Sequence, residues 1–509
     1  MMSTTIFAAP RPLLSPPPPP QPILPPALPL AGPPDQLARQ EFTLLEAWLS
    51  SARVLQLPLH QVECQQWPKG REVLRLLLQA HLQHRGHGEV GPALCVHQAT
   101  QPVLYTHRRL GTRSLKTIFG EVQITRLGYS RHGAHSIYPL DEALQLPARL
   151  FSYELQKRLI KAAVQGPFQE SIDAIAEITG VLVPKRSLEE LLPEAAQDFD
   201  AFYLQRAPEP EAGLILVGAV DGKGIPMLKP GGAQRTARLT KGQKANRKRM
   251  ATVAAVFSRA PWVRSPEQVV ESLFRTTSAP PAGAPPPPRS ENKRVWASLV
   301  KGKAAVIAEA AQEMQRRDPE RHKTWVALTD GERALQMLVE QTLEVTLILD
   351  LLHVLEKLWK AAYVFDAEGS PEAELWVRQR SLRILRGEVS QVVKGLRQRV
   401  TKLKLYGAKG KTLLGVAAYL YRNRGRMRYD EYLAQGLPIA SGPVEGACKN
   451  LIKDRMERSG MRWTEAMAEA IVKLRAIYLS GHFDSYWSFH IEKDQQRLHP
   501  HGLWSVVPK

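Results

Sequence analysis

Three carboxylates, Asp221, Asp330 and Glu445, occupy positions in the sequence that are typical of catalytic residues. Asp221 and Asp330 each follow an apolar run of strand length, residues 214–220 and 324–329, and Glu445 falls just after a Gly-Pro pair that begins a helix. Three carboxylates from separate segments can hold two Mg²⁺ ions, which prefer oxygen ligands; Mn²⁺ can substitute. Such a pair of ions stabilises both the attacking and the leaving oxygen of an in-line phosphoryl displacement. The pattern predicts that Asp221, Asp330 and Glu445 are catalytic metal ligands, although an isolated Asp-Gly pair also makes an ordinary turn.

The second acid has a rival. Asp350 ends another apolar run, so either Asp330 or Asp350 could be the second ligand. We favour Asp330, because Asp330-Gly331 repeats the form of Asp221-Gly222. Asp350 and His353 then become supporting or structural groups, hydrogen-bonded to each other across one helical turn.

The segments around these acids indicate an α/β core. Residues 214–220, 250–257, 324–329 and 345–350 have the composition of buried strands, and we expect a helix from Trp296 to Arg316. From residue 351 to 436 the pattern is helical. Ser370-Pro371-Glu372 is a start signal and Gly436-Leu437-Pro438 a stop signal. Glu445, Lys449 and Lys453 are spaced by four residues and would share one face of a helix, which is also how a simple surface helix looks.

The first 210 residues differ from this core. Thirteen of the 40 prolines lie between Pro10 and Pro34, which predicts an extended tail. Helical spacing follows in residues 42–82, and residues 114–119 and 122–127 alternate around Gly120-Glu121 as a hairpin does. An amphipathic helix over residues 170–180, a short turn and a helix from Lys185 match the helix-turn-helix pattern.

Composition narrows the partner and the compartment. The 509 residues carry 69 Lys and Arg against 49 Asp and Glu, a net charge of +20, which favours a nucleic acid partner. Three scattered cysteines exclude a disulfide framework, and we expect neither a membrane span nor a signal peptide. The expected setting is therefore the cytoplasm, in association with the nucleoid.

Basic residues cluster near the acids. No Asp or Glu occurs between Asp221 and Glu267, whereas Lys and Arg recur there, so this stretch could hold a phosphate backbone. The predicted DNA contacts are Lys185, Arg186, Lys241, Lys244, Arg247, Lys248, Arg249, Lys449, Lys453, Arg455, Arg458 and Arg462.

Taken together, the motifs resemble a known family. Residues 219–222 (AVDG), 328–331 (LTDG), 350–353 (DLLH) and 441–446 (SGPVEG), with 455–456 and 459–463, are similar to those of DDE-type bacterial insertion-sequence transposases, close to the ISKra-type elements and related to the Mutator-like group. The resemblance spans roughly residues 105–490. It implies an RNase H-like core with a helical insertion before the glutamate, Asp330 as the second acid, binding to transposon ends and metal-dependent strand transfer.

We therefore expect a DNA transposase that acts on terminal inverted repeats, with a dimer or larger assembly bringing two ends together. The alternatives are an RNase H-like nuclease without strand transfer, and a DNA-binding protein or inactive copy. The expected segments are a disordered tail (1–40), a helical and hairpin region (41–148), a helix-turn-helix-like region (149–208), the first part of the core (209–350), a helical insertion (351–437), the glutamate-bearing helices (438–490) and a C-terminal tail (491–509).

Overall fold

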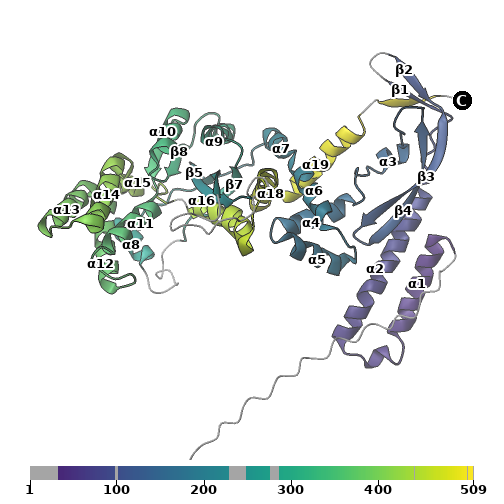
Figure 1. Cartoon of the computed structure of the whole chain (residues 1–509), viewed down its shortest axis with the longest axis horizontal. Helices are drawn as coiled ribbons and strands as arrows, with labels where there is room; N and C mark the ends of the chain where they lie inside the picture. Colours follow the sequence, from purple (N-terminus) through teal and green to yellow (C-terminus); the bar gives the residue numbers. More distant parts are fainter. Residues whose placement is uncertain are drawn as a thin grey trace, which may run out of the picture.

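The structure is a computed structural model that describes residues 32–97, 101–228, 248–274, 286–440, 442–500 and 503–507. It is a mixed α/β protein. Figure 1 shows a central sheet with a helical block on one side and an N-terminal region of helices and strands on the other. Within these described residues no helix is both long and apolar enough to cross a membrane.

The central sheet has five strands in the order β7-β6-β5-β8-β9. β5 pairs with β6, and β6 with β7, in antiparallel fashion, whereas β5, β8 and β9 run parallel. Their side chains are buried almost throughout, as expected for a sheet covered on both faces. The strands are β5 (Ile215–Pro226), β6 (Lys248–Arg259), β7 (Glu291–Ser298), β8 (Thr324–Thr329) and β9 (Thr346–Leu349).

Helices cover the two faces of this sheet. On one face α9 (Lys303–Arg317) packs on β5 and β6, and Gly218 makes room there for the sulfur of Met314. The other face meets the short helix α16 (Gly442–Ala447), the π-helix η3 (Cys448–Lys453) and α18 (Glu465–Leu479), as Figure 1 shows. The remaining short elements here are α8 (Pro266–Leu273), α10 (Arg333–Thr342), α17 (Asp454–Met456) and η4 (Arg458–Gly460).

The block between β9 and α16 is helical throughout, as the sequence predicts. Its start signal is confirmed, since the Ser370 hydroxyl accepts a hydrogen bond from Ala373 N (3.2 Å). Its stop is also confirmed, because Gly436 has a φ of 72°, a left-handed conformation suited to glycine. The helices are α11 (Leu351–Ala362), α12 (Pro371–Leu385), α13 (Val389–Lys402), α14 (Gly407–Asn423), η2 (Arg424–Arg426) and α15 (Tyr429–Ala434).

The N-terminal region contains the predicted hairpin, longer than expected and with its turn at Ile118-Phe119. Two boundaries were wrong. Helix α1 begins at Pro34, inside the predicted tail, and the C-terminal segment is ordered, because a strand near the end of the chain pairs with β1. The elements are α1 (Pro34–Leu49), η1 (Val54–Gln56), α2 (Leu59–His84), β1 (Leu94–His97), β2 (Pro102–Tyr105), β3 (His107–Thr117), β4 (Gly120–Ser130), α3 (Pro139–Ala143), α19 (Phe483–Leu498) and β10 (Trp504–Val506).

Four helices lie between this region and the sheet: α4 (Tyr153–Ala163), α5 (Phe168–Thr179), α6 (Lys185–Ala196) and α7 (Phe199–Gln205). A further correction concerns the predicted helix from Trp296. Residues 291–298 form strand β7, and the helix begins only at Lys303. Gly302 immediately precedes the helix, and Trp296 is a buried residue of the edge strand β7.

Candidate active site

Strands β5 and β8 bring Asp221 and Asp330 side by side. They are parallel neighbours, and Val220 lies opposite Thr329, so the next residue on each strand is one of the two acids. The expected abrupt end of β5 at Asp221 was wrong. β5 continues to Pro226 because β6 still pairs with it, Asp221 lying opposite Val253. Asp221 therefore lies on β5 at the point where β8 no longer pairs with it. This is a topological switch point, because the chain adds strands on one side of β5 and then on the other, and open α/β sheets bind ligands at such points.

Backbone hydrogen bonds orient both carboxylates. Asp221 Oδ1 accepts from Gly222 N (2.6 Å) and Asp330 Oδ1 from Glu332 N (2.8 Å). Burial raises the pKa of Asp330 above its usual value, and the charge of Asp221 raises it further, while the Glu332 amide opposes both effects. The charge of Asp221 therefore adds to the effect of burial on Asp330.

The helical block also contributes to this edge. The ring of Tyr419, on α14, packs directly on Gly331, where an added Cβ would lie 2.1 Å from the ring. The Tyr419 hydroxyl is buried and has no hydrogen-bond partner among the described residues. Burial raises the pKa of Tyr419, and the charges of Asp330 and Asp350 raise it further. Gly331 is therefore required by close packing, a reason that Asp-Gly turn chemistry does not supply.

Asp350 has a structural environment. It is 1% exposed, and its Oδ1 accepts from Leu352 N (2.8 Å), so it caps α11. The His353 ring lies 3.6 Å from Glu356, one turn further along the helix, and its expected hydrogen bond to Asp350 stays a prediction. Asp350 is also held through its backbone, which donates to Thr329 O (3.0 Å). Its assignment as a supporting group remains a prediction.

The helix that carries Glu445 lies against the same edge. Its α16 backbone contacts β5, and one turn later the Cys448 thiol donates a hydrogen bond to Asp221 Oδ2 (3.1 Å). Residues three apart on a helix share a face. The Glu445 side chain lies outside the described residues, so its contact with the two aspartates stays a prediction.

A metal fits this donor set. Neither Asp221 nor Asp330 forms an ion pair with a Lys or Arg of the described residues, although the Glu332 amide and the charge of His353 lower the pKa of Asp330. Carboxylate oxygens are the ligands that Mg²⁺ prefers. The described residues contain no group of three His, Cys, Asp or Glu side chains that could hold an ion. Glu445, the third ligand that the sequence predicts, has its side chain outside the described residues.

The predicted DNA-contacting cations are less uniform than expected. Lys449, Lys453, Arg458 and Arg462 are exposed near the site, although Arg458 lies 3.9 Å from Glu170. Lys241, Lys244 and Arg247 lie outside the described residues. The expectation that the basic stretch is uncompensated was wrong for its last two members, since Lys248 pairs with Glu457 and Arg249 with Glu465.

Arg455 is a clear correction. Its side chain is fully buried, its Nε donates to Ala163 O (2.9 Å), and its guanidinium lies over the rings of Phe168 and Trp463. Burial lowers the pKa of Arg455 to about 10, and neighbouring Arg475 adds to the effect. Arg455 therefore joins α4, α5 and the glutamate-bearing helices and cannot reach a phosphate.

The helix-turn-helix-like pair has an unsuitable charge. Lys185 and Arg186 are exposed at the start of α6, but each faces a glutamate four residues later, Glu189 and Glu190. The outer face of α5 carries the acids Glu170, Asp173 and Glu177. The apolar face of α6 packs against α18 and α4. A surface this acidic would repel a phosphate backbone, so we do not retain α6 as the helix that reads DNA.

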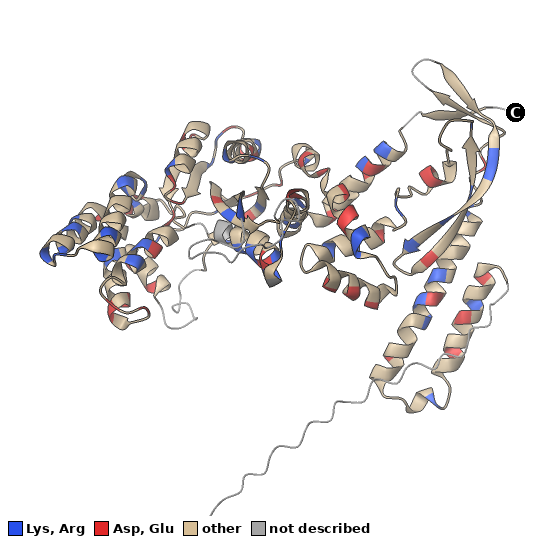
Figure 2. Cartoon of the chain, viewed as in Figure 1, with Lys and Arg blue, Asp and Glu red and all other residues tan. Residues whose placement is uncertain are grey.

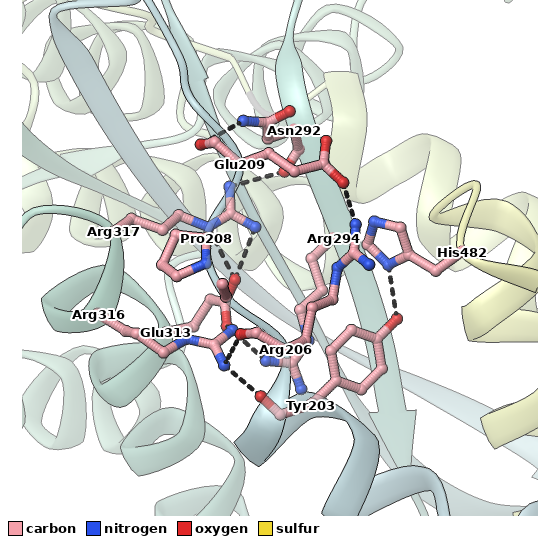
Figure 3. Close-up of a pocket in the computed structure, with 11 residues that line it drawn as sticks. Tyr203, Arg206, Pro208, Glu209, Asn292, Arg294, Glu313, Arg316, Arg317 and His482 are labelled. Atoms are coloured by element: carbon pink, nitrogen blue, oxygen red, sulfur yellow. Dashed lines mark hydrogen bonds and ion pairs between the residues drawn. The ribbon is translucent and has the colours of Figure 1, made fainter. Parts of the chain in front are cut away.

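A second polar site lies beside the sheet and is closed by its own contacts (Figure 3). Glu313 pairs with Arg294, Arg316 and Arg317; these four residues form the Glu313 network. Burial alone would raise the pKa of Glu313, but the three arginines outweigh it and hold that pKa below its usual value. The cavity holds about 20 Å³, roughly one water molecule. This network is structural and leaves no room for a substrate.

Comparisons with known proteins do not identify the chain. No family model matches it, and no curated protein matches it significantly. Sequence reasoning also missed two residues of the site, Cys448 and Tyr419. Cys448 could have been suspected from its position one turn after Glu445, whereas nothing in the sequence connects Tyr419 with Gly331.

Proposed function

We propose that the chain is a DDE-type DNA transposase that binds the ends of its element, cuts phosphodiester bonds and joins the freed 3′ hydroxyl to target DNA. Its catalytic ligands are Asp221, Asp330 and Glu445. One observation carries the proposal: two carboxylates without a Lys or Arg partner among the described residues lie side by side on β5 and after β8, and the Glu445 helix packs on β5.

The strand arrangement supports an RNase H-like core. β5 lies in the middle, β6 and β7 extend the sheet antiparallel on one side, and β8 and β9 extend it parallel on the other. The helical block enters between β9 and α16, which is where the family resemblance expects an insertion. Tyr419 gives that block a direct contact with the site.

The residues divide the work in a simple way. Asp221 and Asp330, oriented by backbone amides, would hold Mg²⁺ together with Glu445. The bound ions would supply Lewis acidity to the phosphoryl transfer. The Cys448 thiol would fix the orientation of Asp221, and the exposed cations Lys449 and Lys453, on the π-helix that follows the Glu445 helix, would hold the DNA strand. The partners are duplex DNA and a second copy of the chain, since two ends must be joined.

The decisive experiment compares the wild type with Glu445→Gln on labelled element ends in Mg²⁺. We expect the variant to fold and bind the ends, because the nearby cations remain, but to give neither cleavage nor strand transfer. Mn²⁺ should restore a trace, since it tolerates neutral ligands better. Cleavage near the wild-type rate would refute the triad. Cleavage by the wild type without strand-transfer products would instead identify a nuclease.

A further inference from the structure

The helical block carries a basic surface that the sequence analysis did not single out. From Val389 to Tyr429 there is no Asp or Glu, and the same stretch contains eleven Lys and Arg residues. It comprises α13, α14, η2 and the first residue of α15. Figure 2 shows these basic residues gathered at the end of the molecule farthest from the N-terminal region.

Eight cations on and beside the helical hairpin formed by α13 and α14 are exposed. Those from α13 through α14 form no ion pair with any carboxylate of the described residues, in contrast to the cations of α4 and α6. We call the following exposed set the α13–α14 basic surface: Lys394, Arg397, Lys402, Lys404, Lys409, Lys411, Arg422 and Arg424. Unpaired surface cations that repel one another are a cost to the isolated fold, which a polyanion would relieve.

Aromatic side chains lie among these cations. Tyr406 is 82% exposed at the turn between the two helices, and Tyr421 lies between the guanidinium groups of Arg397 and Arg424, 5.3 and 4.1 Å from its ring centre. Exposed tyrosine hydroxyls, like Lys and Arg side chains, donate hydrogen bonds to DNA phosphates. An anionic membrane is a poorer match, because the apolar faces of α13 and α14 are buried in the block and only scattered apolar side chains are left outside.

Helix α14 connects this surface to the candidate active site. Tyr419 near its end contacts Gly331, and Lys409 lies ten residues earlier, which is about 15 Å along the helix axis. One turn of duplex DNA spans about 34 Å. A duplex whose scissile phosphate lies at Asp221 and Asp330 thus comes within half a turn of the hairpin.

We propose that the α13–α14 basic surface binds the phosphate backbone of duplex DNA adjacent to the cleaved bond. This inference rests on the proposed function for the identity of the ligand. It assigns to the hairpin the main non-specific grip on DNA, a role that the sequence had assigned to α6 and to the stretch after β5.

The test measures binding of a labelled duplex of arbitrary sequence to the full chain, in EDTA, across a salt series. The variant replaces Lys402, Lys404, Lys409 and Lys411 with Gln. If all four contact phosphates, the slope of log K against log salt falls by about 3 to 4 units, and the affinity near 0.15 M salt falls on the order of 10²-fold. Arginine at the same four positions should restore the slope.

A matched control removes four cations that already face carboxylates, Lys157, Arg158, Lys185 and Arg186, and should change the slope little. An unchanged slope in the hairpin variant, or a loss confined to vesicles of anionic lipid, overturns the proposal. The two hypotheses fail separately. DNA cleavage with a hairpin-independent slope refutes this surface alone, whereas a hairpin-dependent slope without any metal-dependent cleavage supports the surface and refutes the transposase.

Discussion

The core holds carboxylates in two contrasting environments. In the Glu313 network three arginines surround one glutamate, and its pKa is held low. At the edge of the same sheet Asp330 has another carboxylate beside it, no Lys or Arg of the described residues pairs with it, and its pKa is raised. A buried charge that the protein neutralises itself belongs to the architecture. Two neighbouring carboxylates without a basic partner, in contrast, are the arrangement that a cation site requires.

The largest effect is expected from a substitution at the Asp221–Asp330 site. Asp330→Asn should lower Mg²⁺-dependent cleavage on the order of 10³-fold, since metal polarisation is worth several kcal/mol. Without metal the variant should melt at a higher temperature than the wild type, because the repulsion from Asp221 is gone. Cleavage assays and thermal melts in EDTA measure the two effects. An active Asp330→Asn variant together with an inert, folded Asp350→Asn variant would transfer the role to Asp350.

A substitution in the Glu313 network should instead lower stability and leave cleavage intact. Glu313→Gln removes the carboxylate that Arg294, Arg316 and Arg317 share, and among the described residues only Arg317 keeps another, Glu211 (3.8 Å). The change should destabilise the fold by about 3 to 5 kcal/mol. Chemical denaturation measures this loss, and the folded fraction should still cleave DNA. The exposed Glu320→Gln, which loses only a contact with His322, is the matched control and should change stability by less than about 0.5 kcal/mol. A mild loss in Glu313→Gln would mean that water replaces the carboxylate.

Metal binding provides a direct measure of the same contrast. Mg²⁺ at about 100 times its dissociation constant should stabilise the wild type by about 2.7 kcal/mol. The Asp330→Asn variant should lose most of that gain, whereas Glu313→Gln should keep it, because its charges are already paired. Thermal melts over a Mg²⁺ titration test both statements. An equal gain in the wild type and Asp330→Asn would place the bound ion elsewhere.

The sequence predicted the parts of this comparison that depend on local pattern. The runs before Asp221 and Asp330 are buried parallel strands, and the residues from 351 to 436 are helical, because burial and capping leave clear signals. It failed where distant segments meet. The last three residues of β7, from Trp296, were assigned to the following helix, since their pattern fits either period. Lys248, Arg249 and Arg455 find their partners in Glu457, Glu465 and Ala163. These partners are far away in the chain, so the three charges were taken as free. The contact of Tyr419 with Gly331 likewise depends on packing alone.

A smaller effect separates capping from catalysis. Asp350→Ala removes the oxygen that accepts from Leu352 N and should cost about 1 kcal/mol, while Asp350→Asn keeps an acceptor and should cost less. Denaturation midpoints of the two variants provide the measurement. Similar losses in both would show that the negative charge of Asp350, rather than its hydrogen bond to α11, stabilises the fold.

The smallest effect concerns His482, which lies beside the Glu313 network and whose Nδ1 forms a hydrogen bond with the Tyr203 hydroxyl (3.1 Å). Burial lowers the pKa of His482 to about 4, and the charges of Arg206 and Arg294 add to the effect. An unfolded histidine takes up a proton near pH 6.5, whereas the folded one does not until about pH 4. The folded state therefore loses stability as the pH falls through this window. His482→Gln should lose less, and the difference between the two melting curves isolates this group from the acids that titrate nearby. The charge of Glu313 favours the protonated imidazole, so Glu313→Gln should steepen the loss of stability with falling pH. If His482→Gln leaves the dependence of melting temperature on pH unchanged, protonation of His482 does not destabilise the fold.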